Sequence, residues 1–264
     1  MADSPLVPFD AARPSTARLH DYALGGKDNF RVDRDKATEL EKIFPLAPVL
    51  AREGREFQAR AVSYVARRGV TQFIDVGSGM PASPSTYEVA SLASPAARVA
   101  YVDNDPVVIS HTTALLADPG RVTAVAGDAR CPGDIMASPA LTALIDTTSP
   151  FGLILAMILN FIEPGEAATI VAAFRDRMPA GSYLIVSIGI NNDAPDVAQD
   201  WIAAYRAAAR VHEHSRAQIE GYFTGLEMVE PGLTEARNWR PAQPPADQAA
   251  RPADALAGVG RKGR

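Results

Sequence analysis

Cysteine is almost absent from this chain, and histidine is scarce. The 264 residues include one cysteine, Cys131, and four histidines. A single thiol cannot form an intramolecular disulfide, which fits a reducing compartment. The sequence identifies no base partner for Cys131, so we interpret this thiol as a bystander. The histidines show no metal-ligand spacing, and we expect no metal site.

Long apolar runs are also missing. No segment approaches the ~20 consecutive apolar residues of a membrane-spanning helix, and the first residues lack the apolar core of a signal peptide. The net charge of −5 gives no electrostatic basis for binding nucleic acid or an anionic membrane. We therefore expect a cytoplasmic protein with no nucleic-acid or membrane partner.

The first quarter of the chain is predicted to be helical. Residues 1–13 contain proline and aspartate and are expected to be flexible. Helical apolar spacing, with glycine or proline at the ends, predicts helices over 15–24, 33–44 and 48–68. We interpret residues 14–69 as a helical cap.

Strands and helices alternate after residue 70. Continuously apolar runs predict strands over 72–76, 98–103, 121–127, 151–157 and 182–188. Helices are predicted between them, near 84–93, 106–117, 132–145 and 163–178. This alternation predicts an α/β fold with a doubly wound, mostly parallel sheet that is covered on both faces.

The last part of the chain is predicted less regularly. A helix is expected over about 196–212, and segments 225–232 and 233–239 are interpreted as two final strands of an antiparallel hairpin. Residues 241–264 are rich in Pro, Ala, Gln and Arg without periodicity, so we expect a disordered tail there. The α/β domain is assigned to 70–240.

A glycine turn follows the first predicted strand, in the segment FIDVGSGMP at 73–81. Gly77 and Gly79 let the backbone approach a ligand closely, because glycine has no Cβ and tolerates positive φ. The spacing also satisfies the dinucleotide fingerprint G-x-G-x-x-A. Pro81 argues against that interpretation, because it stands where the pyrophosphate-binding helix would begin.

Three acids lie at the ends of three successive predicted strands: Asp75, Asp103 and Asp128. The carboxyl ends of parallel strands share one edge of a sheet, so these side chains are expected near one another. A carboxylate after the second strand suits a ribose diol, because it accepts two hydroxyl hydrogen bonds. Together the three positions suit an adenosine joined to an amino acid. Each acid alone would also suit a helix cap.

The motifs DVGSG, YVDNDP and GDAR resemble motifs I, II and III of class I S-adenosylmethionine-dependent methyltransferases. The segment ARLHDYALGGKDNFRVDRD at 17–35 is more specific. With the late GLEMVEPGL, it resembles an actinobacterial "S-adenosyl methyltransferase" family once catalogued as a domain of unknown function. The likeness runs from about Pro14 to Pro241. It implies a Rossmann-like S-adenosylmethionine-binding domain with a seven-stranded sheet.

The resemblance assigns cofactor contacts residue by residue. Asp75 with the two glycines would hold the methionine part, Asp103 the ribose, and Met157 would lie near the cofactor sulfur. Adenine would be contacted by Asn104, Asp128 and Ala129. The front motif is interpreted as a cap over the cofactor edge, against the alternative of a helix C-cap with a solvated turn. Its expected cofactor residues are Tyr22, Gly26, Lys27 and Asn29.

The implied activity is methyl transfer from S-adenosylmethionine, and a small-molecule acceptor is preferred. Candidate catalytic groups are His20, Tyr22 and Asn160, which stands where the family tends to have a histidine. Three alternatives stay open: a cofactor-binding protein without catalysis, an NAD-dependent oxidoreductase, and transfer of the aminocarboxypropyl group. A monomer or a homodimer is expected.

Overall fold

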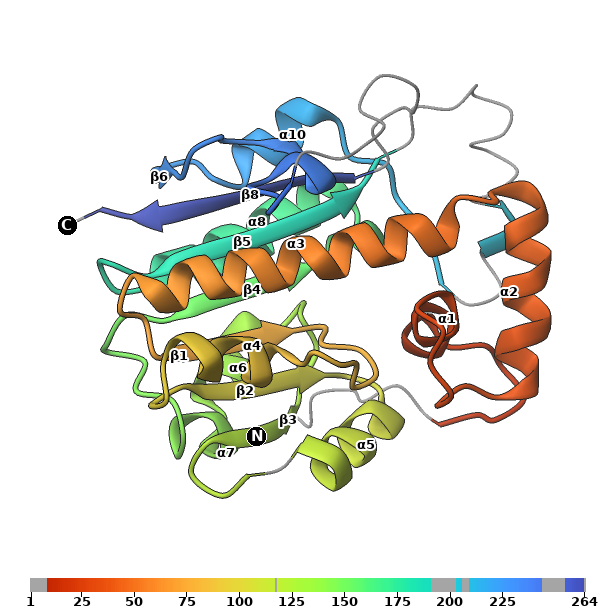
Figure 1. Ribbon diagram of the computed structural model, residues 1–264, viewed down its shortest axis with the longest axis horizontal. Helices are drawn as coiled ribbons and strands as arrows, with labels where there is room; N and C mark the ends of the chain where they lie inside the picture. The colour runs from red at the N-terminus through yellow and green to blue at the C-terminus, as the bar shows by residue number, and fades with distance from the viewer. Residues whose placement is uncertain (1–8, 117, 191–202, 206–208, 244–254, 264) are drawn as a thin grey trace.

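The computed structural model describes residues 9–116, 118–190, 203–205, 209–243 and 255–263 (Figure 1). The predicted flexible segment 1–13 and the predicted helix 196–212 lie largely outside these ranges. None of the helices within the ranges combines the length and apolar character of a membrane span.

Five parallel strands form the centre of the sheet, and each begins and ends within one residue of its prediction. The spatial order of these strands is β3-β2-β1-β4-β5. Their apolar side chains are almost entirely buried, because helices cover both faces. Their bounds are β1 Gln72–Val76, β2 Arg98–Asp103, β3 Val122–Ala126, β4 Gly152–Ala156 and β5 Tyr183–Gly189.

The register brings the strand-end acids to one edge. Asp75 on β1 pairs with Tyr101 on β2, and Asp103 pairs with Ala126 on β3. The chain runs outward through β2 and β3 and then returns to β4 on the other side of β1. Strand order therefore reverses between β1 and β4, which is where open α/β sheets bind ligands.

The sheet has eight strands where seven were expected, and the disordered-tail prediction is wrong for its last part. β8 (Ala255–Lys262) lies antiparallel between β5 and β6 (Leu226–Met228), and β7 (Thr234–Glu235) also pairs with β8. β6 and β7 therefore do not pair with each other as a hairpin.

Small residues explain why the composition near the end of the chain indicated disorder. A Cβ added at Gly260 would stand 2.9 Å from a ring carbon of Phe223, and one added at Gly258 would stand 3.1 Å from Met228 Cε. The strand needs glycine at these positions so that it can pass beneath large side chains. The same glycines removed the apolar pattern by which a buried strand is predicted.

Helices cover the two faces of the sheet. One apolar core lies under α6, α7, α8 and α10, and the other lies under α3 and α4. The helix predicted over 132–145 is divided into two at Pro139. The bounds are α3 Ala47–Arg67, α4 Thr86–Ala93, α5 Pro106–Leu116, α6 Pro132–Ala137, α7 Pro139–Thr142, α8 Pro164–Arg177 and α10 Arg216–Gly221, with short 3-10 turns η1 Leu159–Phe161 and η2 Ala236–Asn238.

The predicted cap over 14–69 has two structurally distinct parts. Figure 1 shows α3 running across the front of β4 and β5, where Phe57, Ala61 and Val65 are completely buried. α1 (Thr16–Ala23) and α2 (Arg31–Ile43) instead stand beyond the carboxyl ends of the strands and have a small core of their own. α3 thus belongs to the sheet, while α1 and α2 form the cap proper.

Candidate cofactor and acceptor site

A cavity of about 1010 Å³ lies between the carboxyl edge of the sheet and the cap. The strand ends, α1, α2, the first half of α3 and residues 209–213 all contribute to its wall. The predicted site residues that line it are Asp75, Gly77, Gly79, Asp103, Asn104, Asp128, Ala129, Met157, His20 and Asn160.

The carboxylate of Asp75 is buried at the end of β1. Its Oδ2 accepts hydrogen bonds from Gln58 Nε2 on α3 (2.9 Å) and from Thr86 Oγ1 on α4 (2.7 Å). Burial raises the pKa of this carboxyl, and the two hydrogen bonds partly offset that effect. Gln58 and Thr86 were not predicted. No local motif marks them, because they reach Asp75 from two separate helices.

The carboxylate of Asp103 is 8% exposed at the end of β2. Its Oδ2 accepts from the backbone N–H of Gly79 (2.9 Å), and its Oδ1 accepts from that of Asp105 (3.0 Å). Burial raises the pKa of Asp103 to about 6 despite these hydrogen bonds. Ionising this carboxyl at the edge of the cavity therefore costs free energy.

The glycine turn stands directly beside this carboxylate. Gly77 (φ 70°) and Gly79 (φ 66°) both have left-handed backbones, which favour glycine. A Cβ on Gly77 would lie 2.6 Å from Ile158 Cγ1, whereas a Cβ on Gly79 would meet open space. The hydroxyl Oγ of Ser78 is buried and has no hydrogen-bond partner among the described residues. The turn therefore presents open space to the cavity at Gly79.

Asp128 follows β3 and lies on the rim of the cavity. Its Oδ1 accepts from the backbone N–H of Arg130 (2.9 Å), and Asn104 Nδ2 lies 3.4 Å from its Oδ2. Arg130 also donates to the carbonyl of Phe161 (3.0 Å). The segments after β2, β3 and β4 are thus held together around the cavity.

Met157 occupies the end of β4 with a left-handed backbone (φ 57°), which is rare for a residue with a side chain. Its side chain lies in a slot between two glycines: a Cβ on Gly54 would stand 3.3 Å from Met157 Cγ, and one on Gly189 would stand 3.5 Å from Met157 Cε. Strained backbone of this kind gathers at ligand sites.

The predicted front-motif contacts Tyr22, Gly26, Lys27 and Asn29 are not among the residues that line the cavity. The turn is organised by Asp21, whose Oδ2 accepts from Asn29 Nδ2 (2.8 Å) and from the backbone N–H of Asp28 (3.0 Å). A Cβ on Gly26 would stand 2.0 Å from Asp21 Oδ1. The glycine and the amide are therefore explained by packing inside the cap, and the geometry does not support them as cofactor contacts.

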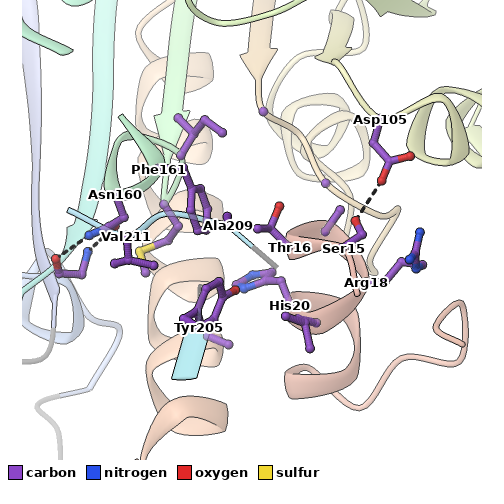
Figure 2. A pocket seen from close by; sticks show the side chains of 18 of the residues that line it. Ser15, Thr16, Arg18, His20, Asp105, Asn160, Phe161, Tyr205, Ala209 and Val211 are labelled. Atoms are coloured by element: carbon purple, nitrogen blue, oxygen red, sulfur yellow. Dashed lines mark hydrogen bonds between the residues drawn. The ribbon is translucent and has the colours of Figure 1, made fainter. Parts of the chain in front are cut away.

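A second buried acid fixes α1 against α2. Asp33 accepts from Arg18 Nε (2.7 Å), and their side chains are 0% and 2% exposed. Asp33 also accepts from the backbone N–H groups of Ser15 and Phe30. The hydroxyl of Ser15 is left to donate to Asp105 Oδ2 (2.8 Å), which joins the cap to the segment after β2 (Figure 2).

A family model described as S-adenosyl methyltransferase matches residues 4–263. The chain belongs to the S-adenosyl methyltransferase family. The enzyme is a methyltransferase that uses S-adenosylmethionine, and the match gives no support to an NAD-dependent oxidoreductase.

Solved structures agree with this family. A candidate methyltransferase from Thermobifida fusca is 35% identical over 97% of both chains, with a TM-score of 0.91. A DUF574 family protein from Streptomyces avermitilis is 34% identical over 96% of this chain and 99% of its own, with a TM-score of 0.90. Magnesium protoporphyrin IX methyltransferase from Synechocystis, 13% identical with a TM-score of 0.52 over 92% and 93% of the two chains, shares the fold. No curated protein matches the chain.

The three predicted catalytic candidates of this methyltransferase differ in position. Tyr22 packs in the small core of the cap. Asn160 exchanges two hydrogen bonds with Gly189, donating to its carbonyl (2.8 Å) and accepting from its N–H (2.9 Å), as Figure 2 shows. An amide has no basicity and both polar atoms of Asn160 are engaged, so this side chain acts as a tie between η1 and β5.

His20, like Asn160, lines the cavity, but its side chain is not tied to β5. It comes from α1, and its imidazole points toward the aromatic side chains of Phe161 and Tyr205 (Figure 2). Burial, and then the nearby Arg55 guanidinium, lower the pKa of His20 to about 4. The imidazole is therefore neutral at physiological pH.

Proposed function

We propose that this methyltransferase binds S-adenosylmethionine along the strand-end acids and methylates a small molecule held beneath the cap. The observation that carries the proposal is a single cavity with two unlike walls. The strand ends supply three carboxylates, whereas the cap and α3 supply mainly apolar side chains. One wall suits the cofactor and the other suits an acceptor.

The residues on the strand side fit the cofactor in their chemistry. The ribose hydroxyls are donors, and Asp103 offers them a carboxylate whose burial is costly until donors reach it. The cofactor's ammonium group suits Asp75, which burial likewise disfavours as an anion. Gly77 and Gly79 would contact the methionine part. Adenine would lie against Asn104, Asp128 and Ala129.

The open space at Gly79 supports the same placement. Arg55 lines the cavity near Asp75 and donates to the carbonyls of Ala82 and Pro84. A guanidinium has five N–H donors, so others are left for the cofactor's carboxylate.

A small acceptor fits the size and shape of the cavity. Pockets for cofactors and small ligands generally measure about 300–1,000 Å³. A volume of about 1010 Å³ provides room for the cofactor and one modest acceptor. The net charge of −5 does not favour a nucleic-acid acceptor.

The bound cofactor supplies an electrophilic methyl group on a sulfonium. The protein's own contribution is alignment and exclusion of water: Met157 closes the floor between Gly54 and Gly189, and the Ser15–Asp105 hydrogen bond holds the cap over the edge. We also propose a cytoplasmic location, which the lone free thiol of Cys131 supports. Fractionation of the native host cells would test it.

Calorimetry with S-adenosylhomocysteine and with NADH tests the cofactor. We expect binding of the first alone, with a large loss in an Asp103→Ala variant. Incubation with methyl-labelled S-adenosylmethionine and a host extract, separated into low- and high-molecular-weight fractions, tests the acceptor. Label in the low-molecular-weight fraction supports the proposal. Label confined to protein or RNA would refute a small acceptor.

A further inference from the structure

The cap side of the cavity has an aromatic wall. The rings of Phe161, in η1, and Tyr205 are stacked, with centroids 6.0 Å apart and an interplanar angle of 28°. Burial raises the pKa of the Tyr205 hydroxyl. Leu24, Leu40, Phe44 and Leu50 also line the cavity. A wall of this composition suits a flat apolar molecule.

The imidazole of His20 reaches toward this wall (Figure 2). Its imidazole makes no hydrogen bond with the residues that the structure describes. The charged group that acts on it most is Arg55 on α3, and Glu41 on α2 also lines the cavity. A neutral imidazole has one nitrogen that accepts a proton and one that donates. His20 therefore offers an acceptor nitrogen beside the aromatic wall.

We propose that the cap half of the cavity binds a flat aromatic acceptor that carries a hydroxyl group, and that His20 accepts the hydroxyl proton during methyl transfer. This inference rests on the proposed function and specifies its substrate class. The acceptor oxygen forms the new bond to the methyl carbon. The carbon–sulfur bond breaks, with its electron pair left on sulfur, and the proton moves to the imidazole. The resulting imidazolium releases that proton to water after the methylated product has left.

The positions of the groups favour a hydroxyl over an amine. A protonated amine has no free electron pair and is repelled by the sulfonium, so it would have to lose its proton before it could attack the methyl group. A phenol-type hydroxyl enters neutral and needs one acceptor, which His20 provides. The imidazole stays unprotonated through the neutral pH range because its pKa is about 4. Its acceptor nitrogen is therefore unprotonated at neutral pH.

Naphthol, methoxynaphthalene and para-nitrophenol test the inference on the full chain. With the protein saturated in S-adenosylhomocysteine, naphthol should bind more tightly than methoxynaphthalene, which cannot donate a proton. His20→Asn should weaken naphthol by roughly two- to tenfold, the usual effect of one lost hydrogen bond. It should leave S-adenosylhomocysteine binding unchanged, which also shows that the variant is folded.

Single-turnover transfer supplies a second readout that a structural role would not alter. The wild-type rate with naphthol should be flat from pH ~6 to ~9, whereas His20→Asn should be slower by about 10²–10⁴ and should rise tenfold per pH unit. Para-nitrophenol, already ionised near neutral pH, should recover a wild-type rate in the variant. His111→Asn, on α5 and outside the cavity, is the matched histidine control.

Two failures are distinguishable. If the wild type does not bind S-adenosylhomocysteine, the proposed function itself is wrong. If it binds S-adenosylhomocysteine but neither binds nor methylates naphthol, or if His20→Asn leaves the rate and its pH profile unchanged, the substrate class and the role of His20 are wrong while the cofactor site stands.

Discussion

Replacing Asp103 with asparagine is expected to remove the pH dependence of cofactor binding near pH 6. We propose that the ribose hydroxyls donate to this side chain, and a carboxylate anion accepts such hydrogen bonds more strongly than the neutral acid does. Its pKa in the folded protein is about 6, so roughly one molecule in eleven is ionised at pH 5. Wild-type affinity for S-adenosylhomocysteine should therefore fall about tenfold between pH ~7.5 and pH ~5.

Asp103→Asn should raise the free energy of unfolding of the ligand-free protein at neutral pH. The folded pKa lies above the ordinary value of 3.8, so this carboxyl contributes stability that is present below pH 3.8 and is lost as the pH rises through about 6. The difference (6 − 3.8 = 2.2) corresponds to about 3 kcal/mol at neutral pH. Asparagine removes this cost of ionisation and so stabilises the protein. Part of the gain is lost, because the amide has one acceptor oxygen, whereas the two carboxylate oxygens accept from the N–H groups of Gly79 and Asp105.

The assay is calorimetry across this pH range, with adenosine as a second ligand. Adenosine lacks the amino-acid part, so its binding separates Asp103 from the other buried carboxyl, Asp75. Asp75→Asn is the matched control and should keep the midpoint near 6 for adenosine. An unchanged pH dependence in Asp103→Asn, or a flat profile in the wild type, would refute the reasoning.

Three other substitutions have expected outcomes. Gly77→Ala should lower the free energy of unfolding by about 1–3 kcal/mol in chemical denaturation and abolish S-adenosylhomocysteine binding. The reason is that φ at Gly77 is 70° and the new Cβ would collide with Ile158. Normal binding by the variant would show that the turn adapts to a side chain. Arg18→Met should lower the free energy of unfolding by about 3–5 kcal/mol, because it leaves Asp33 buried without its cation. Adding Asp33→Leu should recover much of this loss. If the effects of the two substitutions were simply additive, the pairing would be contradicted. Asn160→Ala should lower the stability measured in a thermal melt by about 1–3 kcal/mol, because the two hydrogen bonds with Gly189 are lost. The pH profile of methyl transfer should stay unchanged. A shifted profile would show that Asn160 has a chemical role.

The central sheet was predictable because its signal is local. Each parallel strand is buried on both faces and so appears as an apolar run, and Asp75 and Asp103 follow directly from where two of those runs end. The prediction that they face one cavity needs only the rule that parallel strands end at the same edge.

The cap was harder to predict because its chemistry depends on contacts between segments. The front motif has many polar residues, which suggested a ligand. Asp21 and Asn29 instead satisfy one another inside the cap, and this pairing becomes visible only when the turn is folded. Gln58 and Thr86 were not predicted for the same reason: both donate to Asp75, but no local sequence motif indicates that contact.

The position of β8 has a consequence for how the protein is made. This strand, at 255–262, is the shared partner of β5, β6 and β7. During synthesis on the ribosome, those three strands emerge before β8. Until β8 is made, the edges that it will pair with are free, and free strand edges are prone to associate with other chains. A nascent chain stalled before residue 255 should therefore recruit chaperones strongly, and release of the final strand should end that dependence.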